Sequence, residues 1–253
     1  MENEARSDFQ MTTVGDVPAD TFNWMASRYL KQTQRVTWNG YSRWIHQTAR
    51  LIADWHPDSV VDLGCGPGYL LSRLQSMLPD ARLVGVDYAS EMLAQVPPSV
   101  PAKLATMADW STSGHERFDV GVLSFSLRDQ GDVAATLTRL YDRLRPGGHL
   151  VLLETHTPAG WRKWGFEAYV HHALPWWAER VGTRDWAGQP DESPYRWLSR
   201  SHRLWDQSLP TFPQLLYRLG YRDLTVHTQA SDVVLLWSAT VVNLPHEAGL
   251  GGG

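Results

Sequence analysis

The feature that most constrains the fold is a nine-residue run, Val60-Val61-Asp62-Leu63-Gly64-Cys65-Gly66-Pro67-Gly68. A short β-branched segment, typical of a buried strand, leads directly into three glycines at alternate positions. Leucines at helical spacing follow in residues 69–78, so the run joins a strand to a helix through a glycine-rich turn. Glycine permits positive φ and lets a ligand approach the backbone closely. Turns of this kind bind nucleotide-like ligands in doubly wound α/β sheets.

The spacing of the glycines distinguishes two kinds of nucleotide-like ligand. Dinucleotide-binding turns carry G-x-G-x-x-G, which leaves free N–H groups for a pyrophosphate at the start of the helix. This chain has G-x-G-x-G, with the carboxylate of Asp62 just before it. A carboxylate next to a backbone segment that a ligand can approach closely suits a sulfonium amino acid better than a pyrophosphate. A glycine-rich turn without any ligand is the alternative that the turn by itself leaves open.

Strands and helices are predicted to alternate from residue 59 to residue 154. The predicted strands cover 59–63, 81–86, 102–107, 118–125 and 149–154, and the helices between them cover 69–78, 90–96 and 132–144. Further helices are predicted over 21–31, 41–55 and 211–219, and two closing strands over 221–227 and 233–242. This alternation of strands and helices indicates right-handed βαβ units. We expect an α/β, Rossmann-like, doubly wound sheet of seven mostly parallel strands with an antiparallel last strand.

The expected organisation has six segments. They are a flexible arm over 1–20, N-terminal helices over 21–56, a cofactor-binding core over 57–155, a Trp-rich helical lid or insertion over 156–210, a C-terminal helix and strand pair over 211–243, and a flexible tail over 244–253.

Bulk composition limits the partners that the chain can have. Its 253 residues carry a formal net charge of −4 and no basic cluster, which disfavours a nucleic-acid substrate. The single cysteine, Cys65, cannot form a disulfide within the chain, which is typical of a cytoplasmic protein. The acidic first ten residues do not resemble a secretory signal. No apolar stretch approaches the ~20 residues of a membrane span, so no transmembrane segment is expected.

Polar residues follow several of the predicted strands. Asp87 ends the second strand roughly 20 residues after the glycines, where a carboxylate can accept hydrogen bonds from ribose hydroxyls. Asp109 follows the third strand and is placed to take an adenine amino group, with Trp110 or Met107 against the ring; alternatively, it caps a helix. Ser124 ends the fourth strand. Because the carboxyl ends of parallel strands meet at one edge, these residues are predicted to converge on one ligand.

Together these motifs resemble class I S-adenosylmethionine-dependent methyltransferases. A finer likeness, over about residues 20–243, is to the ubiquinone/menaquinone biosynthesis C-methyltransferase family. The run Leu123-Ser124-Phe125-Ser126-Leu127-Arg128-Asp129 resembles that family's serine-phenylalanine-glycine-leucine-arginine-asparagine segment, and Leu152-Leu153-Glu154-Thr155-His156-Thr157-Pro158 resembles its leucine-glutamate-phenylalanine-serine-lysine-proline segment. Ser126 stands where the family has glycine, Asp129 where it has asparagine, and His156 replaces a small polar residue.

The resemblance implies S-adenosyl-L-methionine as cofactor, with S-adenosyl-L-homocysteine as its product. Tyr29 falls where the family has a cofactor-side tyrosine. The residues predicted to bind the cofactor are Tyr29, Asp62, Gly64, Cys65, Gly66, Gly68, Asp87, Tyr88, Met92, Ala108, Asp109, Trp110 and Ser124. No metal is predicted, because His171 and His172 are adjacent, point apart on a helix and have no partner at ligand spacing.

The predicted catalytic residues are Arg128, Asp129 and His156. Methyl transfer requires aligned reactants, exclusion of water and, for a phenol or the ring carbon beside it, removal of a proton. We expect Arg128 to stabilise a phenolate and Asp129 to accept its proton, directly or through water. An Arg–Asp pair that only shapes the loop is the alternative interpretation.

Tryptophan is concentrated in one part of the chain. Seven of the thirteen tryptophans fall between residues 161 and 205. Aromatic rings bury large areas and stack on flat or prenylated ligands, which indicates a substrate pocket. The core of a lid, or the interface of a homodimer, explains this concentration of tryptophans equally well. The residues predicted to contact the substrate are Tyr169, Trp176, Trp177 and Trp197.

We therefore expect a methyltransferase that acts on a small aromatic or hydrophobic acceptor, by C-methylation in quinone-like or secondary-metabolite biosynthesis. Two other classes share the same turn and stay open. One methylates oxygen or nitrogen of a small molecule or a lipid head group. The other binds the cofactor without methylating and acts as a cyclase or a decarboxylase.

Overall fold

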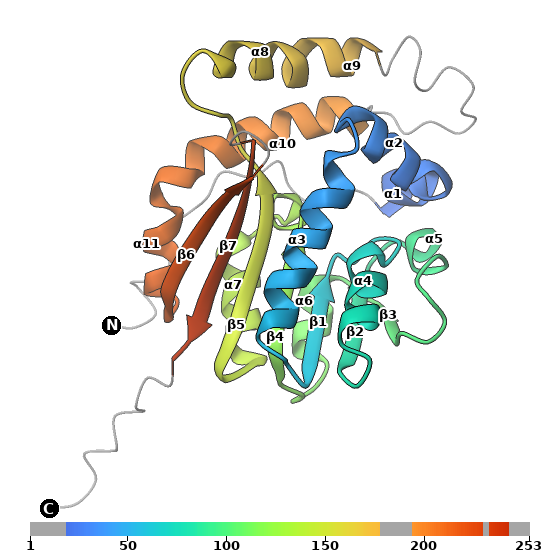
Figure 1. Ribbon diagram of the computed structural model, residues 1–253, viewed down its shortest axis with the longest axis vertical. Coiled ribbons are helices and arrows are strands. Elements are labelled where there is room, and N and C mark those ends of the chain that lie inside the picture. The colour runs from blue at the N-terminus through green and yellow to red at the C-terminus, as the bar shows by residue number, and fades with distance from the viewer. Residues whose placement is uncertain (1–18, 178–193, 230–232, 243–253) are drawn as a thin grey trace, which may run out of the picture.

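Seven strands form a single sheet in the order β3-β2-β1-β4-β5-β7-β6 (Figure 1). The computed structural model describes residues 19–177, 194–229 and 233–242. The strands β1 to β5 run parallel, and β7 runs antiparallel to both of its neighbours, which confirms the predicted fold class. The strands are β1 (Ser59–Leu63), β2 (Arg82–Asp87), β3 (Ala102–Leu104), β4 (Phe118–Ser124), β5 (Leu144–Thr155), β6 (Tyr221–Gln229) and β7 (Val234–Val241).

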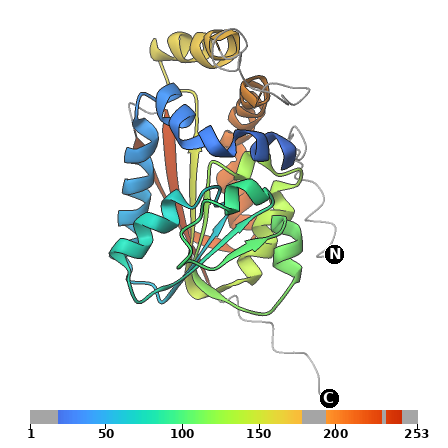
Figure 2. The ribbon, with the colours of Figure 1, turned by 90° about the vertical axis from the view of Figure 1, so that its right-hand side faces the viewer.

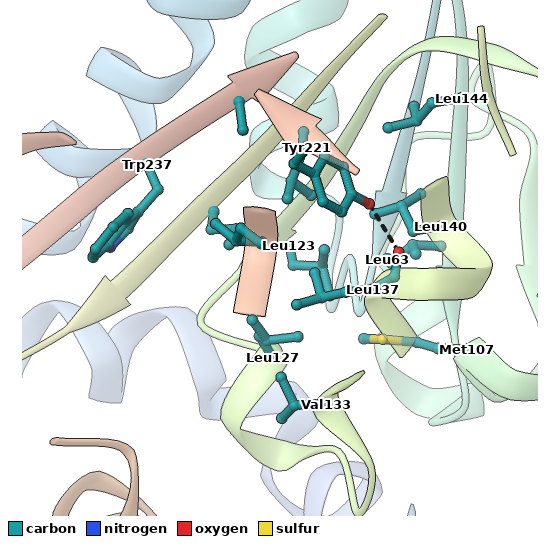
Figure 3. Packing of buried hydrophobic residues seen from close by; sticks show 14 of the residues in the cluster. Leu63, Met107, Leu123, Leu127, Val133, Leu137, Leu140, Leu144, Tyr221 and Trp237 are labelled. Carbon is teal, nitrogen blue, oxygen red and sulfur yellow. Dashed lines mark hydrogen bonds between the residues drawn. The ribbon is translucent and has the colours of Figure 1, made fainter. Parts of the chain in front are cut away.

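Helices cover both faces of the sheet. One face packs against α3 (Gly40–Asp54) and α4 (Tyr69–Met77), whose apolar residues recur at helical spacing and are buried. The other face packs against α6 (Met107–Thr112), α7 (Val133–Asp142) and α11 (Phe212–Arg218). Figure 3 shows this second core, where the buried Tyr221 donates a hydrogen bond of 2.8 Å to the carbonyl of Leu137. Burial of both faces explains the nearly continuous apolar runs of β1 and β4.

A third group of helices lies across the carboxyl ends of the parallel strands (Figures 1 and 2). The first helices of the chain lie close to this edge, and the Trp-rich segment supplies the rest. The group comprises α1 (Ala19–Met25), the 3-10 turn η1 (Ala26–Arg28), α2 (Tyr29–Val36), α8 (Arg162–Ala168), the π-helical turn η3 (Tyr169–Ala173), α9 (Leu174–Trp177) and α10 (Pro194–Ser208). Shorter elements are α5 (Ser90–Leu93) and the 3-10 turns η2 (Leu127–Asp129) and η5 (Leu209–Thr211).

Several predicted elements differ from the structure at their ends. The strand predicted over 149–154 begins at Leu144, so α7 ends at Asp142, and the helix predicted over 90–96 ends at Leu93. The third strand ends at Leu104, and α6 begins at Met107 because Thr106 caps it by accepting from the N–H of Asp109. The helix predicted over 21–31 is instead α1, η1 and α2, which together reach Val36. The predicted flexible arm, apart from residues 19 and 20, and the predicted tail lie outside the described residues, as does Trp186 of the Trp-rich segment.

Candidate active site

The glycine turn after β1 has the backbone that the sequence predicts. Gly64, Gly66 and Gly68 have φ of 71°, 53° and 74°, a region that L side chains rarely adopt. A Cβ on Gly64 would lie 2.5 Å from the Cβ of Ser126, whereas a Cβ on Gly66 would meet nothing within 4 Å. The turn at Gly66 therefore leaves open space beside a positive-φ backbone, as a closely bound ligand requires.

Asp87 holds this turn in place. Its Oδ2 accepts from the N–H of Gly66 at 2.8 Å, and its Oδ1 accepts from the N–H of Ala89 at 2.9 Å. Burial raises the pKa of Asp87, and these backbone hydrogen bonds oppose that rise. The carboxylate thus connects the ends of β1 and β2, and each oxygen retains a further lone pair for a ligand hydroxyl.

Asp62 lies beneath the turn and is 1% exposed. Burial, with a smaller contribution from Asp87, raises its pKa to about 7. Among the described residues its Oδ1 has no hydrogen-bond partner, and the buried Oγ of Ser124 also has none. Unsatisfied buried polar atoms are costly, so these two groups fit a bound ligand that carries amino and hydroxyl groups.

A cleft lies at this edge of the sheet. It brings together seven of the residues predicted to bind the cofactor, namely Tyr29, Gly64, Gly66, Asp87, Tyr88, Met92 and Ser124. The cleft is also lined by Phe22, Met107, Phe125, Ser126, Asp129 and Gln130. The open backbone and the unsatisfied polar atoms fit S-adenosylmethionine, which has an amino group and two ribose hydroxyls.

Six predicted cofactor residues do not line the cleft: Asp62 lies beneath the glycine turn, Gly68 precedes α4 at the end of that turn, and four others lie elsewhere. Trp110 is 1% exposed and packs between Phe118 and the guanidinium of Arg143, because α6 turns it into the core. Asp109 accepts a hydrogen bond of 2.8 Å from Thr106 Oγ1, and Thr106, not Asp109, is the N-cap of the helix. Ala108 is exposed on the same helix. The Cys65 side chain belongs to the core cluster below the sheet, and burial raises its pKa.

A second, mostly apolar cavity, which we call the inner chamber, adjoins the cleft. Its volume is about 140 Å³. Its lining residues are Thr21, Phe22, Met25, Tyr29, Thr33, Val36, Thr37, Tyr41, Trp44, Phe125, Arg128, Asp129, Thr155, Tyr195, Trp197 and Leu198. Four of them, Phe22, Tyr29, Phe125 and Asp129, also line the cleft, and we call them the shared wall. A donor in the cleft and an acceptor in the inner chamber would therefore meet at this wall.

Phe125 is the strained member of the shared wall. It follows β4 with a φ of 58°, an outlier for a bulky residue. Its N–H donates to the carbonyl of Leu153 at 2.7 Å, and the next residue, Ser126, donates through Oγ to the carbonyl of Leu63 at 2.8 Å. These bonds fix the loop between β4 and η2 against both neighbouring strands. The serine that replaces the family's glycine therefore has a structural partner.

Arg128 and Asp129 lie on η2 and are both buried. The guanidinium of Arg128 donates through Nη1 to Glu154, a fully buried carboxylate that also accepts from the N–H of Leu127 at 3.1 Å. Arg128 Nε lies 3.7 Å from Asp129 Oδ1. Burial raises the pKa of Asp129 to about 8, although the cation of Arg128 opposes this rise. The predicted Arg–Asp pair is thus present, and Glu154 is a third charged member that the sequence did not indicate.

His156 is separated from this pair. The structure places it in a third cavity on the other side of α10, which we call the outer groove, with a volume of about 1080 Å³. Representative lining residues are Thr157, Lys163, Glu167, Arg203 and Asp206. Successive residues at the end of a strand point in opposite directions, so Thr155 lines the inner chamber while His156 lines the outer groove. The structure therefore does not bring His156 to the predicted catalytic edge.

The predicted substrate residues also divide between locations. Trp197 lines the inner chamber. Tyr169 donates to the carbonyl of Val36 at 2.7 Å, and Trp177 packs in the same small cluster that joins the Trp-rich segment to α2. Trp176 is exposed. Among the described part of the Trp-rich segment, one predicted residue therefore reaches the chamber and the other three do not line it.

Most of the inner chamber comes from residues that the sequence analysis did not single out. Phe22 and Met25 are spaced by three positions, and so are Tyr41 and Trp44. Such a spacing places side chains on one helical face and is a signal that was available. It does not distinguish a core face from a chamber wall, because both require buried aromatic groups.

The chain is similar to known proteins in sequence. The sequence model of the ubiE/COQ5 methyltransferase family matches residues 10–240. A demethylmenaquinone methyltransferase of Mycolicibacterium gilvum is 29% identical over 224 residues, which cover 88% of this chain and 93% of the relative. A demethylmenaquinone methyltransferase of Corynebacterium kroppenstedtii is 28% identical over 200 residues, which cover 78% of this chain and 82% of the relative.

Two solved structures share the fold. The plantazolicin methyltransferase BpumL in complex with SAH matches with a TM-score of 0.56 at 14% identity, over 95% of this chain and 99% of that one. Human N-acetylserotonin methyltransferase in complex with SAM matches with a TM-score of 0.51 at 15% identity, over 89% of this chain and 60% of that one. Within the described residues, no group of three or more His, Cys, Asp or Glu is placed to hold a metal ion. No helix in the described ranges is both long and apolar enough to cross a membrane.

Proposed function

Because this chain belongs to the ubiE/COQ5 methyltransferase family and is an S-adenosylmethionine-dependent methyltransferase, we propose that it methylates a ring carbon of a small, hydroxylated, quinol-type aromatic acceptor. The observation that carries the proposal is the shared wall, which faces both the cleft and the inner chamber. The names of the curated relatives, which are demethylmenaquinone methyltransferases, support an aromatic quinol as the acceptor.

In this proposal the cleft holds S-adenosylmethionine, which supplies an electrophilic methyl group when bound. Asp87 accepts from ribose hydroxyls, and the glycine turn with Asp62 receives the amino-acid part. The unsatisfied oxygens of Asp62 and Ser124 support this assignment, since a ligand that donates to them would remove an unfavourable state.

The inner chamber holds the acceptor. Its aromatic side chains, among them Phe22, Tyr41, Trp44 and Trp197, offer flat apolar surface to a ring and exclude water from it. A ring carbon becomes nucleophilic when a neighbouring phenol loses its proton. Asp129 is the proposed base: it lines the chamber, and its pKa of about 8 lies between those of a free carboxylate and a phenol.

Arg128 is proposed to stabilise the resulting phenolate. Its Nη1 is already bonded to Glu154, but among the described residues its Nε has no hydrogen-bond partner. A buried donor beside a developing anion lowers the energy of that anion more than a donor in water would. Glu154 keeps the guanidinium in place and is a positioning residue in this scheme.

The position of the transferred methyl group tests the proposal. Purified protein is incubated with S-adenosylmethionine labelled with ¹³C in the methyl group and with a short-chain reduced demethylmenaquinone. We expect the label in the product at a ring carbon. The same quinol with both hydroxyls blocked as methyl ethers is the matched control and should not react.

Other outcomes select the alternatives. A methoxy carbon signal in the product would identify an O-methyltransferase, and consumption of the acceptor without label would identify a cyclase or a decarboxylase. Either result would overturn the proposal. A cytoplasmic location, which the single cysteine favours, and a homodimer stay predictions that accompany the proposed function.

A further inference from the structure

His202 on α10 separates the inner chamber from the outer groove. It is 1% exposed, and both of its ring nitrogens have partners. On the chamber side, Nδ1 lies 3.3 Å from the hydroxyl of Thr155, which lines the inner chamber. On the groove side, Nε2 lies 3.4 Å from Asp206 Oδ2 and 3.2 Å from Thr157 Oγ1. Asp206 and Thr157 both line the outer groove, so the imidazole connects the two cavities.

The chemistry of the partners fixes the direction of these bonds. Nε2 lies 3.4 Å from the Asp206 carboxylate in an ion-pair contact, and its hydrogen bond is to the Thr157 hydroxyl at 3.2 Å; because a carboxylate only accepts, a proton on Nε2 is the favourable arrangement. Nδ1 of a neutral ring is then an acceptor, and Thr155 donates its hydroxyl proton to it. Asp206 is held in place because both of its oxygens accept from the N–H of Thr157 at 3.2 Å. A hydroxyl, an imidazole and a carboxylate thus follow one another in the order found in hydroxyl–His–acid triads.

The ring of His202 is neutral. Burial, with smaller contributions from the charges of Arg128, His171 and His156, lowers its pKa to about 3. A neutral imidazole that donates at one nitrogen and accepts at the other can pass a proton on without holding a positive charge. Burial raises the pKa of Asp206, which therefore accepts a proton more readily than an exposed carboxylate does.

Methylation of an aromatic carbon creates a need for such a connection. The new C–C bond forms from the ring's π electrons, and the ring then loses its proton from the same carbon to become aromatic again. One proton is therefore released in each turnover. Many of the inner chamber's lining side chains are aromatic or aliphatic, so this proton needs a route to solvent.

We propose that Thr155, His202 and Asp206 form a proton relay that carries the proton released in methylation from the inner chamber to the outer groove. In the proton-transfer step, the Thr155 oxygen accepts the proton that leaves the methylated ring carbon while its own proton passes to Nδ1, and the phenol proton held by Asp129 returns to the ring oxygen. The proton on Nε2 passes to Asp206, which becomes neutral and later releases it to water in the groove. No electrons leave the ring system and no other reactant is needed. The inference rests on the proposed function, since it assigns a path to that reaction's proton.

Two isosteric substitutions test the relay. Thr155→Val removes the hydroxyl that lines the inner chamber, and Asp206→Asn keeps the bond from Thr157 but replaces the group that takes the proton. We expect each to lower kcat about 10- to 100-fold at saturating substrates, a size typical of a lost acid–base group. The solvent deuterium isotope effect on kcat should rise, because proton transfer becomes rate-limiting.

Matched variants separate the relay from a structural role. Thr136→Val removes a buried hydroxyl that donates to the carbonyl of Asp132 at the start of α7, away from both cavities, and it should leave kcat within about 2-fold. Thr155→Ser should restore most of the activity that Thr155→Val loses. If Thr155→Val and Asp206→Asn lower only the melting temperature, with kcat and the isotope effect unchanged, the residues are structural and the relay is wrong.

A measurement that needs no acceptor keeps the two proposals apart. The ¹⁵N NMR spectrum of His202 should show a neutral ring with its proton on Nε2. A proton on Nδ1 would prevent donation from Thr155 and would overturn the relay, whatever the enzyme methylates. Failure of the wild-type protein to methylate a quinol would overturn the proposed function and would leave this spectroscopic test intact.

Discussion

The inner chamber and the outer groove lie on opposite sides of α10, and they differ in size and in the state of their charges. The groove is the larger cavity, at about 1080 Å³ against about 140 Å³ for the chamber. Its charged residues include Lys163 and Glu167, which form an exposed pair 3.8 Å apart. The charged residues of the chamber, Arg128 and Asp129, are buried and have perturbed pKa values.

Similar residue types thus have different chemical properties in the two cavities. Water screens an exposed pair, so its charges behave as they do in solution. Burial removes that water and shifts proton equilibria toward the range where a side chain can act as a base. The smaller cavity is therefore the better candidate for chemistry, although the outer groove has the larger volume.

The largest effect expected from this comparison is on stability. Arg128→Ala leaves the fully buried Glu154 without its cation, which should lower the free energy of unfolding by about 3–5 kcal/mol. Lys163→Ala removes the equivalent cation from the outer groove and should cost less than about 0.5 kcal/mol. Urea unfolding of both variants measures the difference, and equal losses would show that burial does not separate the two pairs.

A double variant sharpens the same point. Arg128→Met combined with Glu154→Gln removes both charges, so little of the loss caused by Arg128→Ala should remain. Persistence of the full loss in the double variant would indicate that packing of the arginine side chain, and not its charge, stabilises this region.

The next largest effect is on turnover. Asp129→Asn should lower kcat about 100-fold with little change in cofactor affinity, because the amide cannot accept the acceptor's proton. The variant should also lose the rise of kcat/KM through pH 8 that the pKa of Asp129 implies for the wild-type protein. His156→Gln changes a residue of the outer groove and should leave kcat within about 2-fold. A large loss in His156→Gln would restore the catalytic role predicted from the sequence.

The pH dependence of stability follows from the same burial. Asp62 and Asp129 have folded pKa values raised to about 7 and about 8, so the folded protein binds their protons more tightly than the unfolded chain does. The stabilisation of the folded state by these two groups is complete below about pH 4. It is lost as the pH rises through 7 and 8, and the free energy of unfolding falls by up to about 1.4 kcal/mol per pH unit for each group.

Guanidinium unfolding of the ligand-free protein at pH 5.5 and pH 8.5 should therefore show lower stability at the higher pH. Asp129→Asn should reduce the difference, since the amide stays neutral throughout. A variant with the same pH dependence as the wild type would mean that Asp129 is not the group that titrates.

The smallest effect compares two glycines. Gly165 lies in α8 with open space around its Cβ position, and Gly165→Ala should raise the free energy of unfolding by about 0.5–1 kcal/mol. The space around the Cβ position of Gly66 is equally open, but its φ is 53°. Gly66→Ala should therefore lower the free energy of unfolding by about 1 kcal/mol or more. Thermal unfolding at a fixed pH compares the two, and an equal sign for both changes would contradict this account.

Local signals explain which parts of the fold could be predicted from the sequence. Strands β1, β2 and β4, the glycine turn and Asp87 depend on residues close together in the chain, and the structure has them within one residue of the prediction, whereas β5 begins five residues before its predicted start. The strand predicted over 102–107 was wrong beyond Leu104, although Thr106 and Asp109 form a helix-capping pair that the sequence contains. Asp109 was weighed as a cap, but its partner was not considered.

The inner chamber could not be predicted in the same way, because its wall is assembled from distant segments. Tyr29, Phe125, Thr155 and Trp197 come from four different elements or loops and meet only in the folded chain. The outcome for His156 follows from strand geometry: the side chain after Thr155 points away from the chamber. A prediction made from alternation along β5 would have reached this result, whereas one made from chemical type did not.

The two hydrogen bonds of Asp87 imply something about the thermodynamics of cofactor binding. The carboxylate fixes Gly66 and Ala89 through bonds within the protein, so the conformation of the turn does not depend on contacts with a ligand. An incoming nucleoside then has little ordering entropy to overcome at this end of the site. Affinity there should come mainly from the enthalpy of contacts with a rigid surface, and adaptation to different ligands must occur elsewhere, among the helices that cover the sheet edge.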